Sequence, residues 1–450
     1  MATHPARAQS VPRCAAVVGA GPAGLYALAA LLKGAAFDHI DVFEAAPAPY
    51  GLVRYGVAPD HPKTRNISRV LARGLEHGQV RFLGNVTVGV DVAIGDLRSV
   101  YDAVVVSTGM LGDRSLNIPG EDLAGSVGAS ELVAWYTGHP EAKAIDLPAD
   151  LRTAAVIGAG NVALDVARIL TKNPSALRKT SMPRHVVASL GASALTDVHI
   201  VARRGPAQVK FTSPELHEIG DLDDIDLVVD PADVVLSPDD ERTVAEDRRT
   251  RVLVDLFREW AGRAPRGAPR RIHFHFWRRP TAITGARRVR GVELARTRDD
   301  GTPPSSLPAE MVVRAIGYRG RQVPGLPFDE ATGTIPSIDG RVIADGEIVR
   351  GVYVTGWLRR GPSGVIATNR SDANEVAASV LADLDTLPSR ATPRTDLVEL
   401  LTSRDIRVIS WDDWLRLEEH EKAEGQAHGA DPLVVHDLKT VLEVIARDAE

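Results

Sequence analysis

Three glycines near the start of the chain have the spacing of a phosphate-binding turn. Gly19, Gly21 and Gly24 follow the apolar run 15–18 and precede a segment rich in Ala and Leu that reaches Leu32. A strand that turns sharply into a helix at such glycines lets a pyrophosphate approach the backbone. The helix N-terminus adds free N–H groups and a partial positive charge. This pattern indicates chemistry on a bound dinucleotide.

An acidic residue stands where such a turn needs one. A second apolar run, 40–43, ends in Glu44, and its distance from Gly24 is the usual interval for the acid of this motif. A carboxylate at this point can accept hydrogen bonds from both hydroxyls of a ribose. A glycine-rich surface turn is the simpler alternative, but strand, helix and acid together favour a dinucleotide site.

The same pattern recurs in the second third of the chain. The apolar run 153–157 enters a turn with Gly158 and Gly160, and Ala163 replaces the third glycine. This internal repeat predicts a second dinucleotide site.

The second repeat ends in positive charge. Its second strand, 197–202, is followed by Arg203 and Arg204 instead of an acid. Two guanidinium groups suit a 2′-phosphate, so the second site should prefer NADP to NAD; an exposed arginine pair is the alternative. The interval from Ala163 to Arg203 is roughly twice the usual one, so we expect residues 172–196 to be an insertion.

Composition limits the classes of protein that this chain can be. With 450 residues it should form two or more domains, and its net charge of −6 argues against nucleic-acid binding. No apolar run is long enough for stable membrane insertion. The single cysteine, Cys14, excludes an internal disulfide, a redox-active cysteine pair and a cysteine-held iron–sulfur cluster.

The N-terminal segment could mimic an organelle transit peptide. The segment 1–13 carries Arg7 and Arg13 and no acid, but it is short and lacks a helical apolar face. We expect a disordered tail and a cytoplasmic protein.

Further elements should position the two turns. After the long Pro- and Gly-rich connection 47–63, the chain should form a buried strand over 101–109 and return to the first unit with a parallel strand over 351–357. Strands are also expected at 80–90 and within 263–320. Helices are expected at 64–77, 239–262 and from about Gly364 to Leu384, with two more in 395–450, whose function the pattern does not indicate.

Two histidines share one face of a predicted strand. His273 and His275 alternate with apolar residues in the run 271–277, and imidazoles so placed can bind a metal. No third ligand stands at a suitable spacing, so we predict a plain strand face and no metal site.

Three segments together carry a resemblance to a known family. Residues 50–63, 160–168 and 356–366 resemble the adrenodoxin-reductase-like ferredoxin–NADP reductases, and the similarity spans essentially the whole chain. Ser107, where many members have Ala, and a divergent tail from about residue 430 depart from the family pattern. The departure in the tail affects only the expected partner contacts there.

The resemblance implies an α/β fold with two Rossmann-like dinucleotide-binding domains, the NADP domain being inserted into the FAD domain. The FAD domain would comprise residues 1–112 and 320–450, and the NADP domain residues 113–319. FAD would contact the turn glycines Gly19, Gly21 and Gly24 and, in addition, Ala23, Glu44, Gly51, Leu52, the backbone near Thr87, Trp357, Gly364, Val365 and Ile366. NADP would contact Arg114, Ala159, Gly160, Asn161, Val162, Arg203, Arg204, Glu215 and Gly364.

The implied reaction is hydride transfer from NADPH to FAD, followed by single-electron transfer to a ferredoxin-type small acidic iron–sulfur protein. Hydride transfer from nicotinamide C4 to flavin N5 requires stacked rings and no protein acid or base. The helix expected from Gly364 would direct its N-terminus at the flavin. The candidate catalytic residues are His61 and Glu218, which would handle the flavin proton, orient the nicotinamide, or only form a hydrogen bond in a loop.

A basic region in the middle of the chain could attract an acidic partner. Electrostatic steering would then make turnover fall with added salt, although a solvated helix face explains such charges equally well. We expect a monomer that binds no nucleic acid. The arginines concerned are Arg248, Arg249, Arg251, Arg258, Arg270, Arg271, Arg278 and Arg279.

Three other functions are compatible with parts of the sequence. A disulfide reductase of the same architecture conflicts with the lone Cys14. A flavin monooxygenase would consume oxygen stoichiometrically and form a hydroxylated product. A non-catalytic NADPH-sensing or partner-binding protein would be colourless and would not turn over.

Overall fold

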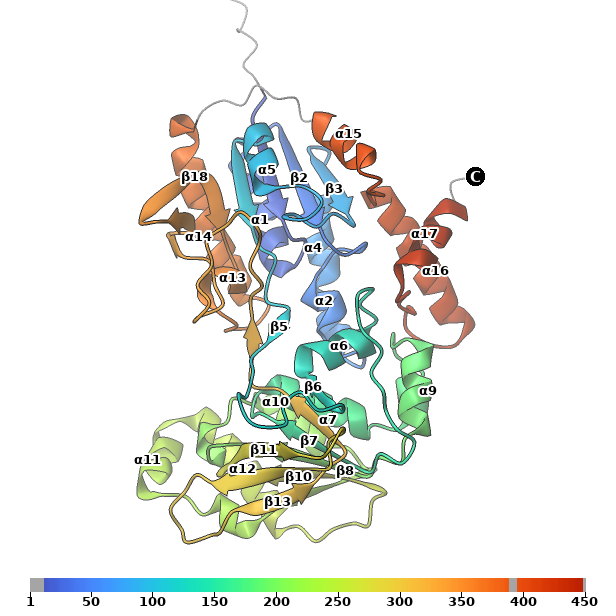
Figure 1. Cartoon of the computed structure of the whole chain (residues 1–450), viewed down its shortest axis with the longest axis vertical. Helices are drawn as coiled ribbons and strands as arrows, with labels where there is room; N and C mark the ends of the chain where they lie inside the picture. Colours follow the sequence, from blue (N-terminus) through green and yellow to red (C-terminus); the bar gives the residue numbers. More distant parts are fainter. Residues whose placement is uncertain (1–11, 388–394, 448–450) are drawn as a thin grey trace, which may run out of the picture.

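Two separate sheets organise the chain, one above the other in Figure 1. The computed structural model describes residues 12–387 and 395–447. Most of the predicted N-terminal tail therefore lies outside the described residues. No helix in the described ranges has the length and apolarity needed to cross a membrane.

The upper sheet has seven strands in the order β16-β17-β18-β4-β1-β2-β3. Its centre is parallel: β1 pairs with β2 and β4, and β18 joins β4 from the far end of the sequence. The bounds are β1 Cys14–Val18, β2 His39–Glu44, β3 Val80–Gly84, β4 Ala103–Val106, β16 Ser337–Ile338, β17 Arg341–Ala344 and β18 Glu347–Val354.

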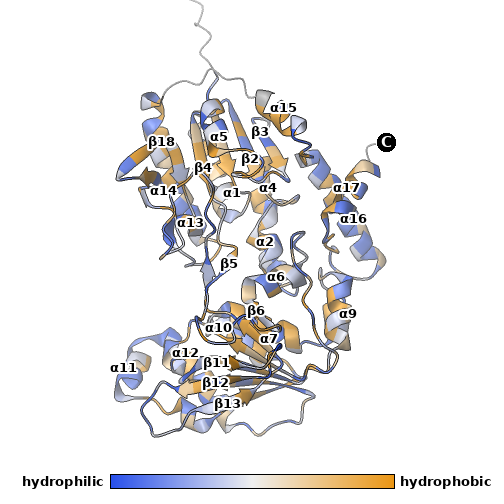
Figure 2. Cartoon of the chain, in the orientation of Figure 1, coloured by the Kyte–Doolittle hydropathy of each residue, from blue (hydrophilic) through white to orange (hydrophobic). Residues whose placement is uncertain are grey.

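Buried apolar residues explain why these segments form the middle of a sheet. Every residue of β1 and of β4 is buried, as expected for parallel strands that are covered on both faces. On one side helix α1, Pro22–Gly34, buries Leu25, Leu28 and Leu31, and full burial of a leucine stabilises a fold by about 2 kcal/mol. Figure 2 shows the hydrophobic colours concentrated along the strands of this sheet.

The other helices around the upper sheet come from both ends of the sequence. They are α2 Leu52–Tyr55, α3 Pro62–Arg65, α4 Ser68–Leu75, α5 Ile94–Val100, α13 Trp357–Arg360, α14 Thr368–Asp383, α15 Thr395–Ser403, α16 Trp411–Ala427 and α17 Leu438–Arg447, with the 3-10 turn η3 Leu384–Thr386.

The lower sheet has six strands in the order β6-β14-β7-β8-β10-β9, and every pairing between its neighbours is parallel. A three-stranded antiparallel sheet, β11-β12-β13, belongs to the same part of the chain. The bounds are β6 Ser126–Gly128, β7 Thr153–Ile157, β8 Asp197–Val201, β9 Ile225–Val229, β10 Arg270–His275, β11 Arg278–Thr284, β12 Gly291–Arg296, β13 Ser305–Pro308 and β14 Met311–Arg314.

The helices of the lower part include the predicted insertion. Residues 172–196 contain α8 and α9, which lie between the crossover helix α7 and strand β8. The elements are α6 Ala129–Thr137, α7 Asn161–Thr171, α8 Pro174–Leu177, α9 Arg184–Ala192, α10 Ser213–Gly220, α11 Pro238–Glu246 and α12 Arg248–Gly262, with the 3-10 turns η1 Pro206–Gln208 and η2 Pro231–Val234.

Two connections join the parts. The chain leaves the upper sheet through β5 Gly112–Asp113 and returns through β15 Tyr318–Arg319, and these strands pair with each other. The division at residues 112 and 320 is consistent with these crossings but stays a prediction.

The C-terminal segment forms a further link between the parts (Figure 1). Arg54 of α2 binds Glu421 of α16 at 2.6 Å, in a pair whose two side chains are nearly buried. Further along the chain the N–H of Asp431 donates to the carbonyl of Lys179 at 2.9 Å. The chain end thus contacts both halves of the molecule.

Several predicted boundaries differ from the structure. The helix expected over 64–77 is two helices, α3 and α4. The strand expected over 80–90 ends at Gly84, because Asn85 adopts a left-handed φ of 59°. The helix expected from Gly364 begins at Thr368, because Gly364 itself has a left-handed φ of 82°. Residues 395–447 hold three helices instead of two.

Candidate functional site

The first glycine turn is closed against the neighbouring strand. Gly19 has a φ of 101°, and a Cβ there would lie 2.6 Å from the carbonyl oxygen of Ser107. A Cβ on Gly24 would overlap the carbonyl of Gly19 and lie 2.5 Å from the Ser107 Oγ. Only glycine fits at these two positions, so α1 packs directly onto β1 and β4.

Three distant segments meet at the N-terminus of α1. A Cβ on Gly51 would lie 2.9 Å from the Cα of Gly21, and a Cβ on Gly356 would lie 2.5 Å from the Cβ of Ala23. The N–H of Tyr50 also donates to Ala20, at 2.8 Å. Bare backbone therefore lines this helix start and brings the next residues along the chain, Leu52 and Trp357, beside it.

Glu44 lies at the end of β2, half-buried next to the first turn. Its carboxylate accepts from the N–H groups of Ala20, at 2.7 Å, and Ala46, at 3.1 Å. Burial raises its pKa, although the two backbone donors oppose that shift. The N–H of Val86 donates to the Glu44 carbonyl at 2.9 Å, so the backbone of Thr87 follows directly at this edge.

The second glycine turn is tight at its first glycine and open at its second. A Cβ on Gly158 would overlap the carbonyl of Ala315, whereas a Cβ on Gly160 would meet no atom within 4 Å. Asn161, the first residue of α7, accepts from the N–H of Thr212 at 2.8 Å. This bond links the turn to the start of α10. Ala159 and Val162, also predicted to contact NADP, flank Gly160 and Asn161.

Glu215 has an unsatisfied oxygen beside this turn. It lies in the first turn of α10, and its Oε2 is buried without a hydrogen-bond partner among the described residues. A buried carboxylate oxygen costs free energy unless a donor reaches it. A ribose hydroxyl is such a donor, as the predicted NADP contact requires.

The predicted 2′-phosphate ligands are exposed. Arg203 and Arg204 follow β8, and their guanidinium groups form no ion pair within the described residues. Arg114 lies apart from them, where its Nε approaches the carbonyl of Tyr318 at 3.4 Å, on the connection between the two parts of the molecule.

Residues 364–366 form a turn before α14. The N–H of Val365 donates to the Thr368 Oγ1 at 3.1 Å, and the apolar Val365 side chain is 65% exposed. Trp357 reaches the same loop, because its Nε1 donates to the carbonyl of Ser363 at 3.1 Å. The helix N-terminus expected at Gly364 is thus displaced to Thr368, while the loop preceding it joins Trp357.

His61 and Glu218 meet across the two parts of the molecule. His61 comes from the loop before α3 and Glu218 from α10, and His61 Nε2 lies 2.8 Å from Glu218 Oε2. This hydrogen bond raises the pKa of His61 and lowers the pKa of Glu218. The pair joins the long connection after the first turn to the helix that follows the second turn.

A buried ionic network beside this pair escaped the sequence analysis. Arg168 of α7 binds Asp60, and it binds Asp165 at 2.7 Å; Lys172 reaches the same Asp60 at 2.6 Å. Arg168 also lies 3.5 Å from Glu218. Asp60 precedes His61 directly, and Asp60, Asp165 and Arg168 all lie in segments that carry the family resemblance, but neither signal shows that they pair. Removing one partner of a buried pair costs about 3–5 kcal/mol, so this network holds the interface rigidly.

A second missed residue shapes the turn at Gly356. Asp372 of α14 accepts from the N–H of Gly356 and, at 2.8 Å, from the hydroxyl of Thr355. It also pairs with Arg359 at 2.7 Å. No motif marks it, because it lies within the following helix and only the fold returns its side chain to the turn.

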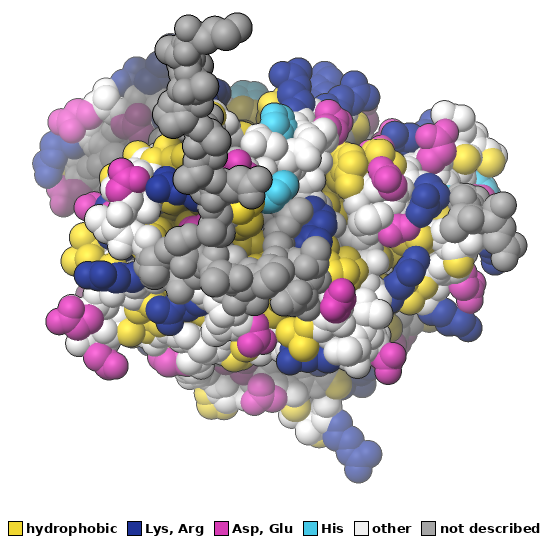
Figure 3. Space-filling model, turned by 90° about the horizontal axis from the view of Figure 1, so that it is seen from above, with side chains coloured by type: hydrophobic (Ala, Val, Ile, Leu, Met, Phe, Trp, Pro, Cys, Tyr) yellow, Lys and Arg dark blue, Asp and Glu magenta, His cyan; other side chains and the backbone are white. Residues whose placement is uncertain are grey.

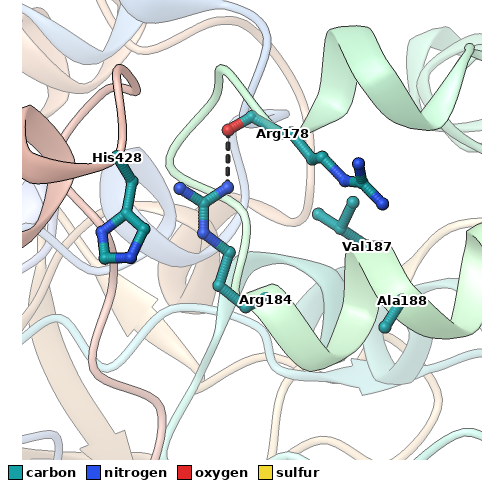
Figure 4. Close-up of a pocket in the computed structure, with 5 residues that line it drawn as sticks. All are labelled: Arg178, Arg184, Val187, Ala188 and His428. Atoms are coloured by element: carbon teal, nitrogen blue, oxygen red, sulfur yellow. Dashed lines mark hydrogen bonds between the residues drawn. The ribbon is translucent and has the colours of Figure 1, made fainter.

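A surface cavity of about 390 Å³ lies away from both turns (Figure 4). Arg184 donates there to the carbonyl of Arg178 at 2.6 Å. The cavity belongs to the inserted helices and the end of α16, and it includes none of the predicted cofactor ligands. Its lining residues are Arg178, Arg184, Val187, Ala188 and His428.

Comparison with known proteins places this geometry in a family. Residues 14–356 match the family described as pyridine nucleotide-disulphide oxidoreductase. The NADPH-ferredoxin reductase FprA of Mycobacterium tuberculosis is 38% identical over 456 residues, which cover 96% of this chain and 99% of the relative. The human mitochondrial NADPH:adrenodoxin oxidoreductase is 39% identical over 436 residues, covering 92% and 88% respectively. The chain belongs to this family of oxidoreductases.

The fold agrees with that assignment. The solved structure of Mycobacterium tuberculosis FprA in complex with NADPH superposes with a TM-score of 0.91 and covers 97% of this chain and 100% of that one. The predicted family and the predicted α/β class with two dinucleotide-binding domains are confirmed. The disulfide chemistry in the broader family's name needs a cysteine pair, and this sequence has only Cys14, which is buried.

Proposed function

We propose that this chain is an FAD-containing NADPH:ferredoxin oxidoreductase. FAD would bind at the first glycine turn and NADPH at the second, and a small acidic iron–sulfur protein of the ferredoxin type would receive the electrons. The observation that carries the proposal is the His61–Glu218 contact at 2.8 Å, which joins the long connection after the first glycine turn to the helix α10 that follows the second. The relatives named for NADPH, ferredoxin and adrenodoxin support it.

The residues present fit both cofactors. At the first turn the backbone of Gly21, Gly51 and Gly356 leaves a surface free of side chains, as a pyrophosphate requires. At the second turn Gly160 is open and Glu215 has a buried oxygen that needs a donor. Exposed Arg203 and Arg204 supply positive charge for a 2′-phosphate.

When bound, the flavin supplies the redox chemistry, which is acceptance of a hydride and release of electrons one at a time. The protein's part is to hold the nicotinamide and the flavin together and to exclude misaligned poses. The buried charges of Asp60, Arg168 and Lys172 fix the loop that carries His61 against α7. His61 and Glu218 would then orient the nicotinamide or hold a proton at the His61 ring.

The partner surface and the cellular setting extend this proposal. Ferredoxin would dock on the lower part, where the arginine-rich segment lies. Figure 3 shows acidic and basic side chains intermingled on the opposite, upper end of the molecule. We also propose a cytoplasmic monomer that binds no nucleic acid.

Purification followed by a flavin spectrum and an electron-transfer assay tests the function. The protein should be yellow, should prefer NADPH to NADH, and should reduce cytochrome c much faster when a ferredoxin is added. A colourless protein without turnover would favour a sensing or binding role. Oxygen consumption that matches NADPH oxidation and yields a hydroxylated product would indicate a monooxygenase.

A further inference from the structure

Three histidines and an aspartate gather on one face of the lower sheet. Asp197 and His199 alternate along β8, and His273 and His275 alternate along the adjacent strand β10. His199 stands directly opposite His273 in the parallel register. Successive side chains of a strand alternate between faces, so all four point to the same side of the sheet.

The contacts within this cluster are close. His273 Nε2 lies 2.7 Å from Asp197 Oδ1, and His199 Nδ1 lies 2.8 Å from His275 Nε2. The rings of His199 and His273 stack with centroids 4.2 Å apart. The plain strand face without a metal stays a prediction, but β8 brings two donor groups beside His273 that the spacing along one strand does not show.

We propose that His199, His273 and Asp197 form a binding site for a divalent transition metal, Zn²⁺ in particular, with His275 orienting the His199 ring. One ligand atom from each of the three residues lies within 4.8 Å of the other two. Tetrahedral Zn²⁺ with bonds of about 2.0–2.1 Å needs ligand atoms about 3.3 Å apart, so the half-buried rings must turn from their stack toward a common point. Solvent would complete the coordination.

Neighbouring groups support the aspartate as a ligand. Arg271 holds Asp197 by two hydrogen bonds, at 2.6 and 2.8 Å, and these contacts lower the pKa of Asp197. A carboxylate has lone pairs for both a guanidinium and a metal. In metal sites a ligating histidine usually forms a hydrogen bond through its other ring nitrogen, which fixes the orientation of the ring. His275 forms such a bond with His199.

The site lies outside the proposed cofactor machinery. His199 lies within β8, and Arg203 follows the end of that strand. The cluster shares no residue with the predicted FAD or NADP contacts. Metal occupancy of the cluster can therefore be measured independently of turnover. A negative result would contradict the metal site without affecting the proposed function.

Equilibrium dialysis of untagged, flavin-loaded protein against Zn²⁺ tests the site. We expect about one Zn²⁺ per chain, with His199→Gln and His273→Gln each weakening binding about 100-fold and His275→Gln about 10-fold. Co²⁺ in the same site should give tetrahedral absorption beyond the flavin bands. His185→Gln is the matched control, because His185 packs on His436 in a tilted ring pair that belongs to no cluster of three metal-ligating side chains among the described residues, and it should bind no metal tightly.

Two results would contradict the proposed Zn²⁺ site. Wild-type protein that holds less than about half an equivalent of Zn²⁺ would leave the cluster a stacked, hydrogen-bonded strand face. Equal losses in His185→Gln and His273→Gln would indicate unspecific surface binding. If a histidine variant loses flavin or helical signal, Asp197→Asn decides, because it retains all three rings and should still weaken Zn²⁺ and shift the Co²⁺ spectrum.

Discussion

The two glycine turns share one plan and differ at their third position. Gly24 has no room for a Cβ, because the carbonyl of Gly19 and the Ser107 hydroxyl occupy the space. The corresponding residue of the second turn is Ala163, whose side chain is fully buried in the core of the lower part. The upper helix therefore approaches its strands without a side chain of its own at this position, whereas the lower one is spaced by a methyl group.

The turns also differ in the charge that follows them. Glu44 is half-buried and held by two backbone donors, while Arg203 and Arg204 are exposed. The comparison teaches that packing at the third position and charge at the end of the second strand are separate variables. The first governs how close the helix lies, and we expect the second to govern which nucleotide is preferred.

Gly24→Ala should have the largest effect. The added methyl group cannot be accommodated without moving α1, so we expect a loss of about 3 kcal/mol in the free energy of unfolding. Flavin retained after purification should fall below about one tenth of the wild-type amount. Ala163→Gly, the converse change in the second turn, should cost only about 1–2 kcal/mol and leave flavin content unchanged. Normal flavin content in Gly24→Ala would show that the two turns do not differ in this way.

Replacing both Arg203 and Arg204 by Gln should abolish the preference for the phosphorylated coenzyme. Each charge-assisted hydrogen bond to a phosphate contributes about 1.5–3 kcal/mol, so the ratio of kcat/KM for NADPH over NADH should fall about 100-fold. Flavin content should not change. Arg287→Gln, an exposed arginine between β11 and β12, is the control. An unaltered ratio would remove these arginines from the nucleotide site.

His61→Gln should alter the pH dependence at the point where the two nucleotide sites meet. Because its hydrogen bond to Glu218 raises the pKa of His61, the charged pair is complete below about pH 6.5 and is lost as pH rises through the raised value. A step in kcat/KM for NADPH should follow that loss in the wild type and disappear in the variant, with less than about a tenfold change in rate at low pH. The same step in both proteins would assign the titration to another group.

Salt should have the smallest effect, and only part of the arginine-rich segment should contribute. Arg258 pairs with Glu241 at 2.5 Å, whereas Arg248 and Arg279 are exposed and form no ion pair in the described ranges. The double variant Arg248→Gln/Arg279→Gln should reduce an acidic ferredoxin about 2–5-fold more slowly than wild type at low ionic strength. The two rates should become equal at high salt. The single variant Arg258→Gln should show a smaller decrease in this rate. Rates that do not change with salt in the wild type and both variants would exclude electrostatic steering.

Local patterns revealed both turns and their strands, but not the contacts between them. The spacing of Gly19, Gly21 and Gly24 is a property of one short segment, so the sequence shows it directly. The packing of Gly51 on Gly21 joins separate segments, and that of Gly356 on Ala23 joins opposite ends of the chain, so no local pattern encodes either contact. The resemblance assigned Gly21, Ala23 and Gly51 to one cofactor without indicating how their segments pack on one another.

The predicted element boundaries were wrong, and some side-chain clusters were missed, for related reasons. The start of α14 moved from Gly364 to Thr368 because a left-handed glycine interrupts the helix, and an apolar pattern does not show backbone conformation. The partners of His273 stayed hidden because they lie on β8, which is adjacent to β10 in the sheet but far from it in sequence. The Asp60–Arg168 pair crosses the two halves in the same way.

The link formed by Glu421 and Asp431 constrains how the enzyme can move. If only β5 and β15 joined the two lobes, these paired strands could act as a hinge and the lobes could rotate apart. Here the tail ties α2 to the segment after α8, on the side away from that hinge. Wide opening would break a nearly buried charge pair, so we expect the two lobes to move little relative to each other during coenzyme exchange. Deleting the tail should therefore weaken the binding of both nucleotides.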